Sequence, residues 1–182
     1  MLRFFLVFLL LILTSNLNAE IKDRIIQNLK KTNNLDFKFE QNINGKIENG
    51  NCTIEYPKKI FCKYLRNKNK ILVSNGKSLV IKTNNSYYRY PLNKTPLNLI
   101  LDKNFLINKI YNLDERIVDN SLVNFTIFDG DNKINIFFDK KTYDLVGWQN
   151  TDIYQNFNIT FLSSLRKNRV LSKNLFKIPF PN

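Results

Sequence analysis

The sequence predicts a mainly β (α+β) protein built on one curved antiparallel sheet. Apolar and polar residues alternate with a period of two through most of the chain beyond residue 36, which is typical of strands with one dry and one wet face. Asn-Gly pairs at 44–45 and 75–76 are typical of tight hairpins. About nine or ten strands in series should curl. Two short helical stretches would cover only part of the concave face, which leaves room for an apolar cavity.

The two helical stretches differ from the rest of the chain in their period. Residues 20–33 place isoleucine and leucine on one face and charged residues opposite. A second helix is expected to begin at Thr95-Pro96, with Thr95 as the N-cap and Pro96 at the first helical position, and to continue in broken form to residue 110.

Strands are expected in the remaining alternating segments. These cover residues 37–43, 52–54, 60–64, 71–82 (a hairpin), 87–92, 121–128, 133–138, 143–148, 153–161 and, last, 176–180. No repeat and no linker divides them, so residues 20–182 are expected to form one domain.

The N-terminus has the pattern of a secretory signal peptide. Arg3 precedes ten apolar residues, Phe4 to Leu13, and a polar stretch then ends at Ala19. Ten residues span roughly 15 Å as a helix, about half of a hydrocarbon core. We therefore expect cleavage after Ala19, with an uncleaved anchor as the alternative. The first cysteine is Cys52, so the mature protein is not expected to be a lipoprotein itself.

The chain is strongly basic. Lys and Arg outnumber Asp and Glu by 28 to 15, and removal of Arg3 with the signal peptide lowers the formal net charge from +13 to +12. Export and the scattered placement of the basic residues argue against a nucleic-acid partner. The remaining interpretations are contact with anionic lipid headgroups, contact with an acidic protein, or solubility alone.

Cys52 and Cys62 are the only cysteines, and an even pair in an exported protein suggests a disulfide. The segment between them contains the turn-forming stretch Tyr56-Pro57-Lys58. If residues 56–58 form the hairpin loop, Cys52 lies directly opposite Cys62 on the adjacent strand, within bonding reach.

The sequence offers little for catalysis. There is no histidine, so the commonest general base and metal ligand are both missing. The carboxylates Asp36, Glu40, Glu48 and Glu55 fall on expected polar faces, which favours solvated surface over an Asp/Glu hydrolase. Residues 129–132 (DGDN) lack the ligand spacing of a calcium loop and fit a hairpin turn. We expect no catalytic residue, no metal site, no cofactor and no enzyme activity.

Several motifs occur together along the chain. They are ILVSNGKSLVI (71–81), YRYPL (88–92), TPLNLIL (95–101), FEQ (39–41), GWQNTD (147–152) and FKIPFPN (176–182). In this order behind a signal peptide, they resemble the periplasmic lipoprotein-carrier (LolA-like) family. The resemblance implies an unclosed β-barrel with a helical lid over an apolar cavity, which carries acylated lipoproteins from the inner to the outer membrane. Residues 20–182 would then form a lipoprotein-carrier domain.

The resemblance also gives roles to residues whose aromatic stripes would otherwise be explained by an ordinary core. The expected cavity wall consists of Phe37, Phe39, Ile54, Ile60, Phe125, Ile127, Phe138, Trp148, Phe157 and Phe161. The expected lid residues are Leu97, Ile100 and Leu101. Many family members carry a lid-controlling arginine where this chain has Tyr56, and a phenol supplies neither the charge nor the fork geometry.

The implied partners are acylated lipoproteins as cargo, an inner-membrane releasing transporter and an outer-membrane acceptor, for a monomeric protein in the periplasm of a Gram-negative bacterium. The alternative function is a lipid- or lipoprotein-sensing regulatory module of the same fold.

Overall fold

The computed structural model describes residues 20–66, 69–130, 132–151 and 156–181. The expected signal peptide, residues 1–19, lies outside this part of the chain. The first element is a helix over residues 20–31, as the isoleucine and leucine periodicity predicts. Within the described residues, no helix is both long and apolar enough to span a bilayer.

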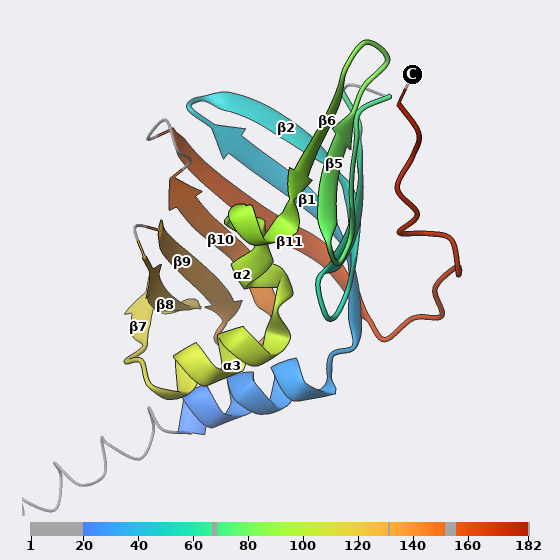
Figure 1. The fold of residues 1–182 in the computed structure, drawn as a ribbon. Helices are drawn as coiled ribbons and strands as arrows, with labels where there is room; N and C mark the ends of the chain where they lie inside the picture. The colour runs from blue at the N-terminus through green and yellow to red at the C-terminus, as the bar shows by residue number, and fades with distance from the viewer. Residues whose placement is uncertain (1–19, 67–68, 131, 152–155, 182) are drawn as a thin grey trace, which may run out of the picture.

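All strands belong to a single antiparallel sheet (Figure 1). The strands are β1 (Asn34–Ile43), β2 (Lys46–Glu55), β3 (Lys59–Tyr64), β4 (Ile71–Asn75), β5 (Ser78–Lys82), β6 (Tyr87–Pro91), β7 (Arg116–Val118), β8 (Leu122–Asp129), β9 (Asn132–Asp139), β10 (Leu145–Thr151) and β11 (Phe157–Lys167). Their order is β6-β5-β4-β3-β2-β1-β11-β10-β9-β8-β7. The end strands β6 and β7 do not pair with each other, so the barrel is unclosed. The predicted fold class is confirmed.

The expected hairpins form at positions where the backbone needs a left-handed conformation. Asn44 and Gly45 have φ values of 48° and 85°, and Gly76 has φ 95°. Asn and Gly tolerate positive φ better than other residues. These turns join β1 to β2 and β4 to β5, and they set the register of both pairs.

Between β6 and β7 the chain forms the short helices that cover the sheet. These are η1 (Leu92–Lys94), α2 (Leu97–Leu101) and α3 (Lys103–Tyr111). The sheet curves around them, with β4–β6 on one side of α2 and β8–β10 on the other, and α3 packs beside the N-terminal helix (Figure 1). The helices and the inner strand faces share one continuous hydrophobic core.

The C-terminal segment differs from the prediction. The strand expected over residues 176–180 is absent, and residues 168–181 run along the outside of the sheet without strand structure (Figure 1). Pro179 and Pro181 lack the N–H group that a ladder needs. Phe176 is buried, and the Lys82 ammonium donates to the Phe180 carbonyl at 2.8 Å.

Candidate functional site

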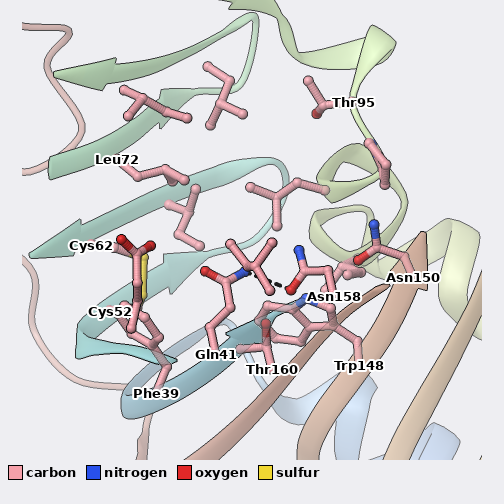
Figure 2. Close-up of a pocket in the computed structure, with 18 of the residues that line it drawn as sticks. Phe39, Gln41, Cys52, Cys62, Leu72, Thr95, Trp148, Asn150, Asn158 and Thr160 are labelled. Atoms are coloured by element: carbon pink, nitrogen blue, oxygen red, sulfur yellow. Dashed lines mark hydrogen bonds between the residues drawn. A yellow bond between two sulfur atoms is a disulfide. The ribbon is translucent and has the colours of Figure 1, made fainter. Parts of the chain in front are cut away.

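A cavity of about 600 Å³ lies between helix α2 and the inner face of the sheet. This volume is within the range of small-molecule sites, roughly 300–1,000 Å³. Most of its wall is apolar, contributed by β1–β5, β10 and α2 (Figure 2). The apolar wall consists of Phe37, Phe39, Ile43, Ile60, Leu72, Leu79, Ile81, Leu97, Ile100, Trp148 and the Cys52 and Cys62 side chains.

Strand β1 directs alternate residues into this cavity. Phe37 meets Trp148 edge-on, with ring centroids 6.5 Å apart, and Phe39 meets Tyr64 at 5.1 Å. Phe39 pairs with Gly50 on β2. A Cβ at Gly50 would lie 2.7 Å from Phe39 Cε1 and 2.1 Å from the Lys63 carbonyl oxygen. Glycine is therefore needed there because the Phe39 ring and strand β3 both approach the backbone.

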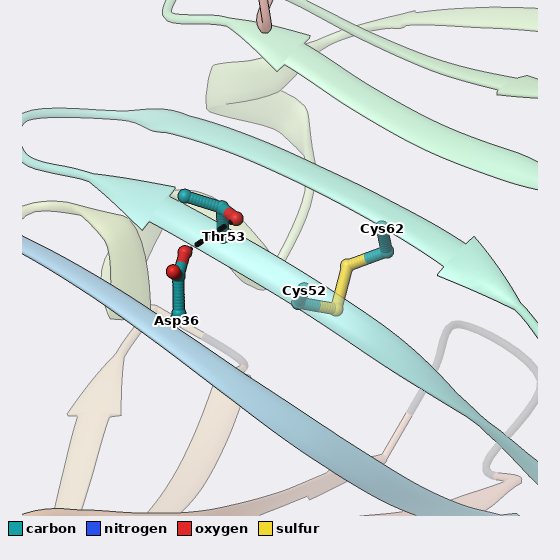
Figure 3. The surroundings of a disulfide bond; sticks show 4 residues. All are labelled: Asp36, Cys52, Thr53 and Cys62. Carbon is teal, nitrogen blue, oxygen red and sulfur yellow. Dashed lines mark hydrogen bonds between the residues drawn. A yellow bond between two sulfur atoms is a disulfide. The ribbon is translucent and has the colours of Figure 1, made fainter. Parts of the chain in front are cut away.

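The predicted disulfide is confirmed. Cys52 and Cys62 are directly opposite in the β2–β3 register and are bonded (Figure 3). Both side chains border the cavity. The adjacent Thr53 points to the other face, where its hydroxyl donates to Asp36 Oδ1 at 2.7 Å. The disulfide therefore ties two strands together beneath the cavity wall and adds apolar surface to it.

Helix α2 places two of the three expected lid residues over the cavity. Leu97 and Ile100 line it, whereas Leu101 is fully buried in the core and outside the lining. The N-cap prediction is wrong by one residue, since Pro96 occupies that position and the Thr95 hydroxyl donates instead to the Leu92 carbonyl at 2.8 Å.

The C-terminal end of α2 is attached to the β2–β3 turn. The Lys58 backbone N–H donates to the Leu101 carbonyl at 2.9 Å. The Lys58 ammonium pairs with Asp102 at 3.2 Å. Asp102 also accepts from the Phe105 N–H at 3.1 Å, which caps α3. Sequence reasoning missed Lys58, because a lysine in a turn carries no sign of a distant partner.

Four of the polar residues that line the cavity lie together on β1, β10 and β11, and they were not predicted. Gln41 on β1 donates from its side-chain amide to Asn158 on β11 at 3.0 Å (Figure 2). Asn150 on β10 and Thr160 on β11 lie beside them and are buried. We call these four residues the polar sector.

An ion pair marks another edge of the cavity. Lys70 and Glu48 both line it, 2.6 Å apart. The Lys70 ammonium also lies 4.1 Å from the centroid of the Tyr64 ring. Burial, with a smaller contribution from the Glu48 carboxylate, raises the pKa of Tyr64 well above its ordinary value.

The expected wall residues divide into those that border the cavity, those in the core, and two on the outer face of the sheet, which are described in the next paragraph. Phe37, Phe39, Ile60 and Trp148 border the cavity. The structure places Ile54, Phe125, Ile127 and Phe138 in the core, almost without exposure and outside the cavity lining. They have the predicted inward direction, but the cavity does not extend to them.

Phe157 and Phe161 require a correction. Both are on the outer face of β11, 49% and 45% exposed, whereas Thr160 faces inward. Phe161 stacks on Phe137 with ring centroids 6.3 Å apart. It pairs with Gly147, whose missing side chain leaves room for the outer ring. Strand β11 carries apolar residues on both faces. The prediction placed the face with the large aromatic side chains inward, and that face is the outer one.

A comparison with protein families gives a match over most of the chain. The family described as outer membrane lipoprotein carrier protein LolA matches residues 28–179. The chain belongs to the LolA family. A comparison with curated proteins found no match.

Solved structures with a similar course of the chain have very different sequences. A LolA superfamily protein from Nitrosomonas europaea is 7% identical, with 88% of this chain and 97% of that chain covered and a TM-score of 0.47. A DUF1329 family protein from Desulfovibrio piger is 9% identical, with the same coverage and TM-score. LprF from Mycobacterium bovis is 11% identical, with 90% and 97% covered and a TM-score of 0.42.

Tyr56 occupies the position where the LolA-like resemblance places a lid-controlling arginine. Its backbone N–H donates to the Asn33 carbonyl at 2.9 Å, and the Lys103 ammonium lies 5.7 Å from its ring centroid. Burial raises the pKa of the phenol, which therefore stays neutral. Lys58, two residues further on, makes the charged contact with the end of α2. A lid-controlling role for Tyr56 itself stays a prediction.

Proposed function

We propose that this protein binds the acyl chains of lipoproteins released from the inner membrane and carries them to the outer membrane. The observation that carries the proposal is a mostly apolar cavity under a five-residue helix in a chain of the LolA family. We further propose that the protein acts as a monomer and not as an enzyme.

The energetics of the cavity suit a carrier. Each acyl CH₂ removed from water contributes roughly 0.8 kcal/mol, so a whole chain contributes on the order of 10 kcal/mol. Cargo must nevertheless leave. Leu97 and Ile100 stand at the cavity on a short helix, and their movement into the emptied space would partly offset the loss of the cargo.

The proposed site of action is the periplasm. Residues 1–19 would be removed as a signal peptide, and the Cys52–Cys62 disulfide suits an oxidising compartment. An inner-membrane releasing transporter and an outer-membrane acceptor would complete the route.

The test adds the mature protein, residues 20–182, to spheroplasts that hold a labelled triacylated lipoprotein. We expect the label to enter the soluble fraction in a one-to-one complex with the lipid chemically unchanged. Label that stays on the membrane, while the protein still binds free acyl chains, would contradict the carrier and favour a sensing module. Cleaved lipid in the soluble fraction would contradict a non-enzymatic role.

A further inference from the structure

The polar sector occupies one defined end of the cavity. In the sheet register Thr160 lies between Gln41 and Trp148, and Asn158 lies between Ile43 and Asn150. These are adjacent cross-strand rows near the β1–β2 hairpin, at the opposite end of β1 from the N-terminal helix. The Cys52–Cys62 disulfide lies across the cavity on β2 and β3 (Figure 2).

The Asn150 side-chain amide donates to the Thr151 carbonyl at 3.3 Å, but part of the hydrogen-bonding capacity of the polar sector has no partner among the described residues. Thr160 is 3% exposed, and its hydroxyl has no hydrogen-bond partner among the described residues. Rotation about χ1 gives that hydroxyl three staggered positions. A primary amide carries two donor hydrogens and an acceptor oxygen, and the Gln41–Asn158 bond uses only one donor and one acceptor.

Asn150 and Thr160 are buried, whereas Gln41 and Asn158 are half-buried. A buried polar group without a partner is costly in a cavity that binds only hydrocarbon. Buried polar groups in proteins nearly always have partners, and each one without a partner destabilises the folded state. Apolar residues of similar size would fill the same positions without that cost. The sector therefore points to a ligand that has a polar group at this end of the cavity.

We propose that the polar sector binds the carbonyl groups of the ester and amide linkages that attach acyl chains to the cargo. This inference rests on the proposed function and adds the class of group that the site recognises. The acyl tails would run from the polar sector toward Phe37 and the disulfide. An ester carbonyl that leaves water must regain a hydrogen bond, and the amide and hydroxyl donors of this sector provide one.

The test compares two lipids that differ only in the carbonyl group. Dipalmitoylglycerol and its diether, dihexadecylglycerol, would each displace a fluorescent fatty acid from the protein. The wild type should bind the diester at least as tightly as the diether. In the double variant Gln41→Met/Asn158→Leu, the ratio of diester to diether affinity should fall about fivefold, the factor of one net hydrogen bond. Diether affinity should not decrease.

A matched control variant tests whether the loss of polar side chains elsewhere in the sheet has the same effect on the affinity ratio. Thr126 and Asn135 form another cross-strand pair, 2.7 Å apart and outside the cavity lining. Thr126→Val/Asn135→Leu should keep the wild-type ratio, and thermal unfolding would confirm that both double variants fold. An unchanged ratio in Gln41→Met/Asn158→Leu would overturn the inference and leave the sector as a site for buried water. Failure of the wild type to bind either lipid would overturn the proposed function as well.

Discussion

The pKa of Tyr64, a residue of the cavity wall, depends on the burial of its side chain. It is 9% exposed, packs edge-on against Phe39 and lies under the Lys70 ammonium. Burial penalises the phenolate, so the pKa of Tyr64 is raised in the folded state. A group whose folded pKa is raised contributes stability below its unfolded pKa, near 10 for tyrosine, and that stability is lost as pH rises above this value.

Tyr64→Phe should therefore make the protein less sensitive to alkali. Between about pH 10 and about pH 11.5, the free energy of unfolding of the wild type should fall by about 2 kcal/mol more than that of the variant. Urea unfolding at several pH values measures this difference. Tyr111→Phe, at a residue 69% exposed, is the control and should follow the wild type. Identical pH profiles of unfolding free energy for Tyr64→Phe and the wild type would contradict a raised pKa of Tyr64 in the folded state.

Helix α2 shows how an element depends on its surroundings. Isolated helices shorter than about 12–15 residues are marginal in water, and α2 has five residues. It is held by Ile100 in the cavity wall and by the Lys58 contacts with Leu101 and Asp102. The Lys58–Asp102 pair is partly exposed, so it contributes little beyond about 1 kcal/mol. Burial of Leu99, Ile100 and Leu101 in the hydrophobic core is then the main attachment.

Leu97→Asp should weaken acyl-chain binding at least about tenfold, because a carboxylate at the cavity would have to lose its water when the chain enters. Leu97 is only half-buried, so the free energy of unfolding should change by less than about 1 kcal/mol. Titration with a fluorescent fatty acid measures the affinity. Asn98→Asp adds the same charge on the same helix outside the cavity lining and should bind normally. Equal affinities for both variants would show that α2 does not close the cavity.

The whole molecule is distinguished by its charge. The formal net charge is +13, and the described ion pairs use only a minority of its basic residues. A charge of this size attracts anionic lipid surfaces over about one Debye length. Docking to headgroups would bring the cavity to the membrane that supplies cargo in the proposed function.

Binding to phosphatidylglycerol vesicles should therefore weaken at least about tenfold between about 20 mM and about 150 mM salt. Co-sedimentation measures the bound fraction, and phosphatidylcholine vesicles are the control. Salt-independent binding, or none at either concentration, would leave solubility as the explanation of the charge.

Local chemistry in the sequence was enough to predict the class of fold and the disulfide. A period of two identifies strands, Asn44-Gly45 identifies a turn, and a hairpin over residues 56–58 sets Cys52 opposite Cys62. These features depend on neighbours within about ten residues along the chain, so the sequence by itself determined them.

The limits of the cavity were decided only by the tertiary structure. Phe39 and Phe125 both point inward from strands of similar pattern, yet Phe39 borders the cavity and Phe125 is sealed in the core. Alternation determines which face a side chain takes, but not what packs against that face. The covering elements, α2 and α3, come from distant parts of the chain. Gln41 and Asn158 likewise meet only because β1 and β11 pair across the sheet.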